Sequence, residues 1–180
     1  RTGRVLANDW CDVGVDLLCL GKGLGGGALP LSAVLVSPAL EASFHGGPDR
    51  AFAHSHTFCG NPLATAAGVA SLRLVQDTVG APLDATIAAL DRMRGELARM
   101  PAVVASRQAG TIVAFDLRAH TKRPADGRIS LALRKAALAR DVLLRPLGDT
   151  LYWMPPLLVP DDALARLGQV TAEAIVEVLG

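Results

Sequence analysis

The sequence is poor in charged and in aromatic residues. Of its 180 residues 19% are charged, 4% are aromatic and 51% are hydrophobic, and the net charge is +1. A nearly neutral chain has no electrostatic preference for nucleic acid or for an anionic membrane surface, and no apolar run approaches the length of a membrane span. We therefore expect neither partner. We expect the surplus of apolar side chains to be covered by further chain or by a second subunit.

Cysteine is also scarce, and the three cysteines are odd in number and follow no pairing pattern, which is typical of reduced thiols in a cytoplasmic protein. His54, His56 and Cys59 lie close together but match no standard zinc framework, so we expect no metal site. The sequence has no signal peptide. It also lacks an initiator methionine before Arg1, and we expect it to be part of a longer protein.

The most informative stretch is an apolar run that ends in Gly21-Lys22-Gly23. We predict that residues 15–20 form a buried strand and that Lys22 follows its end, partly removed from water. Desolvation disfavours the ammonium form and makes the amine available as a nucleophile, as a lysine that bonds to a carbonyl requires. The glycines that follow allow backbone to approach a bound group closely. These residues predict a site for pyridoxal phosphate (PLP).

Two other interpretations of the same residues stay open. Gly21, Gly23 and Gly26 fit G-x-G-x-x-G, a dinucleotide-binding motif when a helix begins at the third glycine. Pro30 and the β-branched run after it instead favour a loop and a second strand over 32–37. The other interpretation is an ordinary solvated lysine beside a glycine-rich turn.

The segment 54–62 predicts a phosphate-binding turn. Asn61 is a typical N-cap and Pro62 fits a first helical turn, so we predict a helix from there to about residue 79. A hydroxyl group just before a helix N-terminus suits phosphate, because the helix dipole and unpaired N–H groups face the anion. Thr57 would supply that hydroxyl. A simple helix cap is the alternative.

The second half of the chain predicts a small domain of helices and strands. Gly80-Ala81-Pro82 marks the expected boundary between a domain at 1–80 and a domain at 81–180. Apolar residues at helical spacing predict a helix from Leu83 to Leu97 and a final helix capped by Asp161. The other expected elements are strands at 103–104, 111–117, 142–145 and 151–154, with a helix at 129–140.

Arg145 ends an apolar run, and an arginine at that position needs an anion. Its guanidinium suits a carboxylate, which it can bind through two hydrogen bonds. An internal ion pair with Asp149 is the alternative. Tyr152 and Trp153 lie on the expected neighbouring strand and would wall the same cavity, unless they are ordinary packing residues.

Lys22, the segment around Thr57 and the segment around Arg145 occur along the chain in the order known from one enzyme family. Over essentially the whole chain the sequence resembles the class III, fold-type I, PLP-dependent aminotransferases. The resemblance is carried by RTG at 1–3, DLLCLGK at 16–22, HTFCGNPLA at 56–64, LRPLGD at 144–149 and YWMPP at 152–156.

The resemblance implies how the cofactor is held. Lys22 would bind PLP covalently and later move the proton that the reaction transfers. Thr57 would reach the phosphate of the PLP in the neighbouring subunit of a homodimer, with His56 beside the cofactor. The family often has Gly-Pro where this chain has Ser55-His56.

The resemblance also implies the remaining site residues and the fold. Arg145 would bind the substrate carboxylate, and Ser55 and Tyr152 would line the substrate site. The parent fold would be α/β, with the second half of the large PLP domain at 1–80 and the small C-terminal α/β domain at 81–180. Several active-site groups would then precede Arg1, so we expect this piece alone to be inactive.

The segment 144–156 is similar to the branch of the family that acts in biotin biosynthesis. It implies S-adenosylmethionine as the amino donor and 8-amino-7-oxononanoate as the acceptor, which becomes 7,8-diaminononanoate. Another ω-aminotransferase, acting on a diamine or an ω-amino acid with a 2-oxo acid, is the nearest alternative. A non-catalytic dimeric homologue and a nicotinamide-binding protein are alternatives from other classes.

Overall fold

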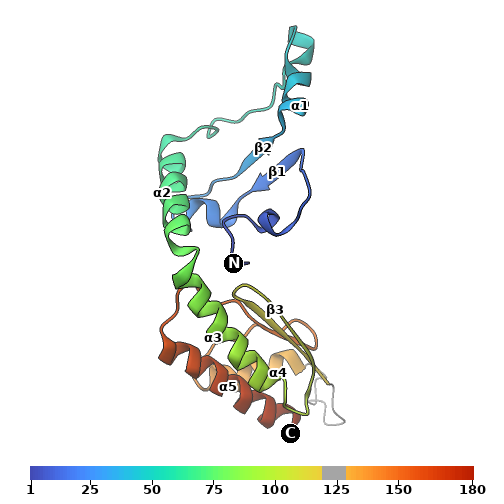
Figure 1. Cartoon of the computed structure of the whole chain (residues 1–180), viewed down its shortest axis with the longest axis vertical. Coiled ribbons are helices and arrows are strands. Elements are labelled where there is room, and N and C mark those ends of the chain that lie inside the picture. The colour runs from blue at the N-terminus through green and yellow to red at the C-terminus, as the bar shows by residue number, and fades with distance from the viewer. Residues whose placement is uncertain (119–128) are drawn as a thin grey trace. The chain divides into compact units, whose positions relative to one another are not determined.

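A computed structural model of the chain describes residues 1–118 and 129–180. They form two compact units, Asn8–Asp77 and a second unit that joins Arg1–Ala7 to Thr78–Gly180 (Figure 1). The assignment of domains to 1–80 and 81–180 stays a prediction. The sequence also predicts a polar loop at 118–128, and almost all of it lies outside the described residues.

The unit Asn8–Asp77 is built on a hairpin and a helix. Strand β1 (Leu17–Leu20) pairs antiparallel with β2 (Ala33–Val36), with Leu17 opposite Val36. The long helix of this unit is α2, Pro62–Thr78, and α1 is the short helix Pro38–Glu41. Its 3₁₀ turns are η1 (Ala7–Trp10), η2 (Lys22–Gly25), η3 (Ala42–Phe44) and η4 (Pro48–Arg50).

The other unit is a three-stranded antiparallel sheet packed against three helices. The strands lie in the order β3 (Val103–Ala109), β4 (Ile112–Leu117) and β5 (Thr150–Trp153). The helices are α3 (Ala81–Leu97), α4 (Ile129–Leu138) and α5 (Asp161–Leu179).

The core of this unit joins the sheet to the helices. Phe115 of β4 meets Trp153 of β5 edge to face, with ring centroids 5.0 Å apart. The Trp153 indole N–H donates a 3.0 Å hydrogen bond to the hydroxyl of Thr171 on α5, and both residues are buried. A buried indole needs such an acceptor. This bond fixes β5 relative to α5.

The expected helices and most of the expected strands are found, but two local predictions are wrong. Residues 142–145 form no strand, since β5 pairs with β4 and meets the preceding segment only at the bridge Leu147↔Thr150. Pro146 explains this, because proline lacks the N–H that a continued ladder requires. The N-cap of α5 is Pro160 rather than Asp161, which is already the first helical residue.

Asp116 makes the folding of the sheet sensitive to acid. Its carboxylate accepts hydrogen bonds from Arg107 and Thr150, and the bond from Arg107 is the main cause of the lowered pKa of Asp116. A carboxylate whose folded pKa is depressed stabilises the fold above its unfolded pKa, and this stabilisation is lost as the pH falls through the folded value.

We therefore expect Asp116→Asn to lower the free energy of unfolding at neutral pH and to have little effect well below the folded pKa. Urea denaturation across the acid range measures this. A wild-type and a variant curve that stay parallel throughout would contradict the assignment.

Candidate functional site

The turn that carries Lys22 is strained. Lys22 follows β1, begins η2 and has φ +50°, the left-handed region that costs a side-chain-bearing residue about 1–2 kcal/mol. Left-handed non-glycine backbone is often kept at functional sites, where surrounding contacts hold it in place. Gly26, with φ +62°, closes the turn through a 3.0 Å hydrogen bond from its N–H to the Gly23 carbonyl.

The predicted burial of this region is wrong. Lys22 is exposed, and β1 is only half-buried at Leu18 and Leu20, while Leu17 is 54% exposed. The reason is that β1 and β2 form a sheet of two strands, which leaves much of the hairpin uncovered within its unit. The Lys22 amine is therefore open to a ligand in the described structure.

Helix α2 holds the Lys22 turn from the side. The Ser71 hydroxyl donates a 2.9 Å hydrogen bond to the Gly23 carbonyl, so that this carbonyl accepts two bonds. Ser71 shares its buried face of α2 with Ala64 and Gly68. Sequence reasoning missed Ser71, because its partner lies 48 residues away and an alanine-rich helix gives no local signal for it.

The Thr57 turn leads directly into α2. The predicted cap is confirmed: the Asn61 side-chain oxygen accepts hydrogen bonds from the N–H groups of Leu63 and Ala64, both at 3.0 Å. These two helical donors are thus occupied. Neither the Thr57 hydroxyl nor its N–H has a partner within the described part of the chain, so both remain available to an anion.

Local hydrogen bonds shape the residues around Thr57. The Phe58 N–H donates to His56 Nδ1 at 3.2 Å, and the His56 N–H donates to Cys59 Sγ at 3.4 Å. Ser55 and His56 are exposed, as is Thr57. No hydrogen bond or ion pair among the described residues joins this turn to Lys22.

Arg145 and Tyr152 are brought together in the other unit. They line a pocket of about 370 Å³ whose remaining walls are largely apolar. Those walls are Leu143, Leu144, Trp153, Met154, Pro155 and Leu167. Arg145 makes no ion pair with Asp149 or with any other described residue, so the alternative of an internal ion pair is not supported. An exposed guanidinium beside apolar walls suits a carboxylate on an aliphatic chain.

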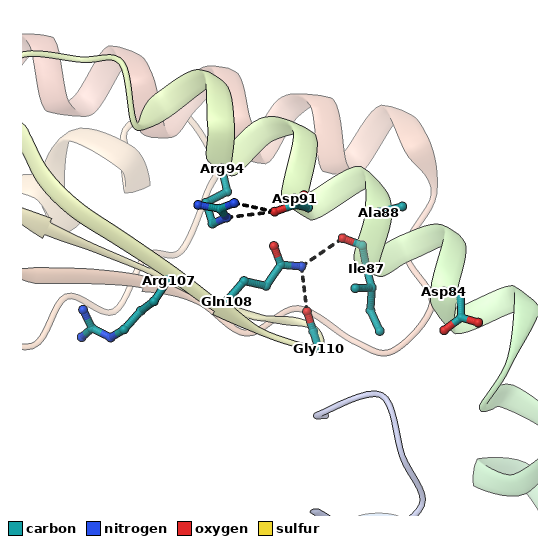
Figure 2. Close-up of a pocket in the computed structure, with 8 residues that line it drawn as sticks. All are labelled: Asp84, Ile87, Ala88, Asp91, Arg94, Arg107, Gln108 and Gly110. Atoms are coloured by element: carbon teal, nitrogen blue, oxygen red, sulfur yellow. Dashed lines mark hydrogen bonds and ion pairs between the residues drawn. The ribbon is translucent and has the colours of Figure 1, made fainter. Parts of the chain in front are cut away.

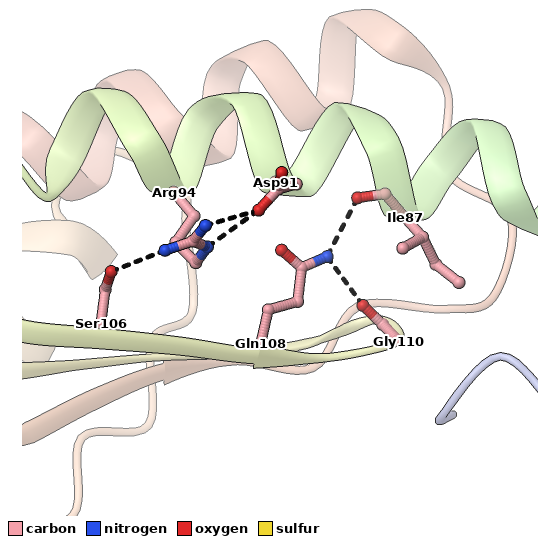
Figure 3. A network of polar contacts seen from close by, with 6 residues as sticks. All are labelled: Ile87, Asp91, Arg94, Ser106, Gln108 and Gly110. Carbon is pink, nitrogen blue, oxygen red and sulfur yellow. Dashed lines mark hydrogen bonds and ion pairs between the residues drawn. The ribbon is translucent and has the colours of Figure 1, made fainter. Parts of the chain in front are cut away.

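A larger pocket, of about 640 Å³, lies between α3 and the β3–β4 hairpin and contains none of the predicted site residues (Figure 2). Some of its polar groups join α3 to β3 (Figure 3). Asp91 pairs with Arg94 at 2.7 Å, and Arg94 donates to Ser106 at 2.9 Å. The Gln108 amide donates to the carbonyls of Ile87 and Gly110. Arg94 and Gln108 of this pocket therefore connect α3 to the β3–β4 hairpin.

The described residues contain neither a metal-binding cluster nor a membrane-spanning helix. No group of three or more His, Cys, Asp or Glu side chains is arranged to hold a metal ion in residues 1–118 and 129–180. None of the described helices combines the length and the hydropathy that a bilayer crossing requires. Cys11, Cys19 and Cys59 are all free thiols.

We expect the Asn61 cap to stabilise the helix that follows the Thr57 turn. Asn61→Ala removes the acceptor for two helical N–H groups and should lower the free energy of unfolding by about 1 kcal/mol. Asn61→Ser, which keeps a capping oxygen, should lose much less. Urea denaturation of the three proteins measures the difference, and equal stability of the alanine and serine variants would contradict the role of the cap.

Comparison with known proteins places these features in a family. The class III aminotransferase family matches residues 1–175. An adenosylmethionine-8-amino-7-oxononanoate aminotransferase of Synechococcus elongatus is 38% identical over 99% of this chain and 42% of its own length. The chain thus spans about two fifths of the curated relatives it matches.

Solved structures agree with this result. An adenosylmethionine-8-amino-7-oxononanoate aminotransferase of Methanocaldococcus jannaschii superposes with a TM-score of 0.86 at 26% identity, covering 99% of this chain and 43% of that one. An amine transaminase from an uncultivated Pseudomonas species, in its PLP-bound form, gives 0.84 at 26% identity, with 99% and 42% covered. The predicted α/β fold is confirmed. The chain belongs to the class III aminotransferase family.

Proposed function

We propose that the protein to which this chain belongs is a PLP-dependent aminotransferase of biotin biosynthesis. It transfers an amino group from S-adenosylmethionine to 8-amino-7-oxononanoate. The observation that carries the proposal is the strained, exposed Lys22 in its glycine-rich turn. The relatives of S. elongatus and M. jannaschii, whose names contain both substrates, support the choice of reaction.

The residues present fit PLP. An exposed lysine amine can bond to the aldehyde, and a hydroxyl with an adjacent unpartnered N–H at Thr57 can bind a phosphate. When bound, PLP supplies the electron sink for the reaction. Lys22 Nζ would hold the cofactor in the resting enzyme and would serve as the base that carries the transferred proton. We assign His56 to the cofactor side of the Thr57 turn.

The acceptor fits the Arg145 pocket. The guanidinium of Arg145 binds the carboxylate of 8-amino-7-oxononanoate, and the apolar walls lie along its aliphatic chain. Tyr152 lines the same pocket, and we assign Ser55 to the substrate side of the Thr57 turn. Because the pocket is largely apolar apart from Arg145 and Tyr152, it selects a chain with one terminal charge over a chain with several.

The enzyme acts as a homodimer in the cytoplasm. Large apolar side chains are strongly exposed in the unit Asn8–Asp77, among them Val34, Phe52 and Phe58, at 55%, 69% and 73%. Exposure on this scale supports coverage by further protein. The free thiols support a reducing compartment.

Another ω-aminotransferase remains the second candidate. Its 2-oxo acid acceptor also carries a carboxylate that Arg145 would bind, and the amine transaminase of the Pseudomonas species has a similar fold. A coupled assay of the complete polypeptide that compares S-adenosylmethionine with alanine as the donor separates the two. Turnover with alanine alone would favour the second candidate.

We expect Lys22→Ala, made in the complete polypeptide, to abolish both turnover and the absorbance band of the lysine-bound cofactor, because no other amine occupies this turn. Lys135→Ala, on the exposed side of α4, is the matched control and should leave both unchanged. Normal turnover of the Lys22 variant would refute its role.

We expect Arg145→Ala to raise the KM for the carboxylate-bearing acceptor by roughly 10- to 150-fold, which corresponds to the loss of a charge-assisted hydrogen bond of about 1.5–3 kcal/mol. Steady-state kinetics at saturating donor measures this. Arg134→Ala, an exposed arginine on α4, should leave the KM unchanged. If the Arg145 variant also keeps the wild-type KM, Arg145 is only structural.

A further inference from the structure

We propose that Ser71 is a positioning residue for Lys22. The inference rests on the proposed role of Lys22 in binding the cofactor and deepens it. The Ser71 hydroxyl donates a hydrogen bond of 2.9 Å to the Gly23 carbonyl, one residue beyond Lys22. Within the described structure, this hydrogen bond connects α2 to the Lys22 turn.

The turn needs an external support because its own geometry is unfavourable. Lys22 has φ +50°, and apart from Leu24 the residues at 23–27 are glycines, which lose the most conformational entropy on folding. The hydrogen bonds of η2 are i→i+3 contacts, among them the bonds from Leu24 to Gly21 at 3.1 Å and from Gly26 to Gly23 at 3.0 Å. Such 3₁₀ bonds have poorer geometry than those of an α-helix.

Ser71 is placed to give that support. It is 9% exposed, and α2 is a regular helix of 17 residues, so the hydroxyl has a fixed origin. A Cβ built at Gly26 would lie 3.3 Å from Ser71 Cβ and Oγ, so the turn passes close against the helix. Gly68, one turn earlier, leaves room for Leu31, whose Cδ2 would lie 2.6 Å from a Cβ at that position.

Serine itself is a poor choice for this helix unless its hydroxyl is used. It has a lower helix propensity than alanine, and its side chain competes for backbone hydrogen bonds. A buried hydroxyl without a partner would also be unfavourable. Here the hydroxyl donates to the Gly23 carbonyl, which offsets the unfavourable helix propensity and the burial of a polar group. The bond fixes the position of the Gly23 carbonyl and, through it, the position of Lys22.

The test compares Ser71→Ala with Thr65→Val in the complete, cofactor-free polypeptide. Thr65 is the matched control, because it is on the same helix and its hydroxyl bonds only to the carbonyls of Asn61 and Pro62. Lysine amines are labelled by reductive methylation with ¹³C-formaldehyde, and the Lys22 signal is assigned by its loss in Lys22→Arg. NMR then reports the surroundings of each lysine.

We expect Ser71→Ala to shift or broaden the Lys22 signal and to leave the Lys135 signal in place, whereas Thr65→Val changes neither. We also expect the rate at which PLP becomes reducibly bound to Lys22 to fall roughly three- to tenfold in Ser71→Ala, the range for one ordinary hydrogen bond. An unchanged Lys22 signal in a folded Ser71→Ala protein would overturn the inference.

Two further measurements keep the test decisive. Amide exchange in the wild type should show Gly26 protected to the same degree as the middle of α2, and exchange as fast as in residues 51–56 would overturn the inference without any variant.

Borohydride reduction and peptide mapping of the wild-type holoenzyme test the proposed function separately. Label on Lys22 with an unchanged Ser71→Ala signal refutes only the role of Ser71, whereas no label on Lys22 refutes the proposed function.

Discussion

The contact between α2 and the turn that carries Lys22 is the constraint on which the candidate site depends. A lysine in left-handed backbone is unfavourable, and it persists only where its neighbours hold it. The Gly23 carbonyl, which accepts bonds from both Gly26 and Ser71, is the point at which the turn is joined to a rigid helix. The strand before Lys22 is too exposed to provide this support alone.

In the other unit, the hydrophobic core holds the strand that carries the pocket residue Tyr152. Strand β5 alternates between buried Leu151 and Trp153 and half-buried Thr150 and Tyr152. The contacts of Trp153 with Phe115 and Thr171 fix this strand, and Tyr152 and Met154 on either side of Trp153 line the pocket with Arg145. A charged group in this pocket has no ionic partner among the described residues, which leaves it free for an anionic ligand.

The sequence allowed local features to be predicted, and it did not reveal contacts between distant segments. Asn61-Pro62 predicts a helix start from capping chemistry alone, and the structure confirms it. The prediction of a strand at 142–145 was wrong because Leu144 is buried there without any strand pairing, while Leu143 is exposed. The prediction that Lys22 is buried was wrong because its burial depends on which segments cover β1, and the sequence near Lys22 does not show them. Ser71 could not be found, since nothing near it in the sequence indicates Gly23 as its partner.

Helix α2 also connects the two segments that we propose for cofactor binding, the Thr57 turn and the Lys22 turn. It begins just after the Thr57 turn and contacts the Lys22 turn through Ser71, ten residues beyond its cap at Asn61. At 1.5 Å per residue, these two points of the helix are about 15 Å apart along its axis. A regular helix keeps these two points apart, so α2 fixes the spacing between the Asn61 cap and the Ser71 contact. In the homodimer that we propose, Thr57 would serve the cofactor of the second subunit, as the family resemblance implies, and α2 would connect that segment to the chain's own Lys22 turn.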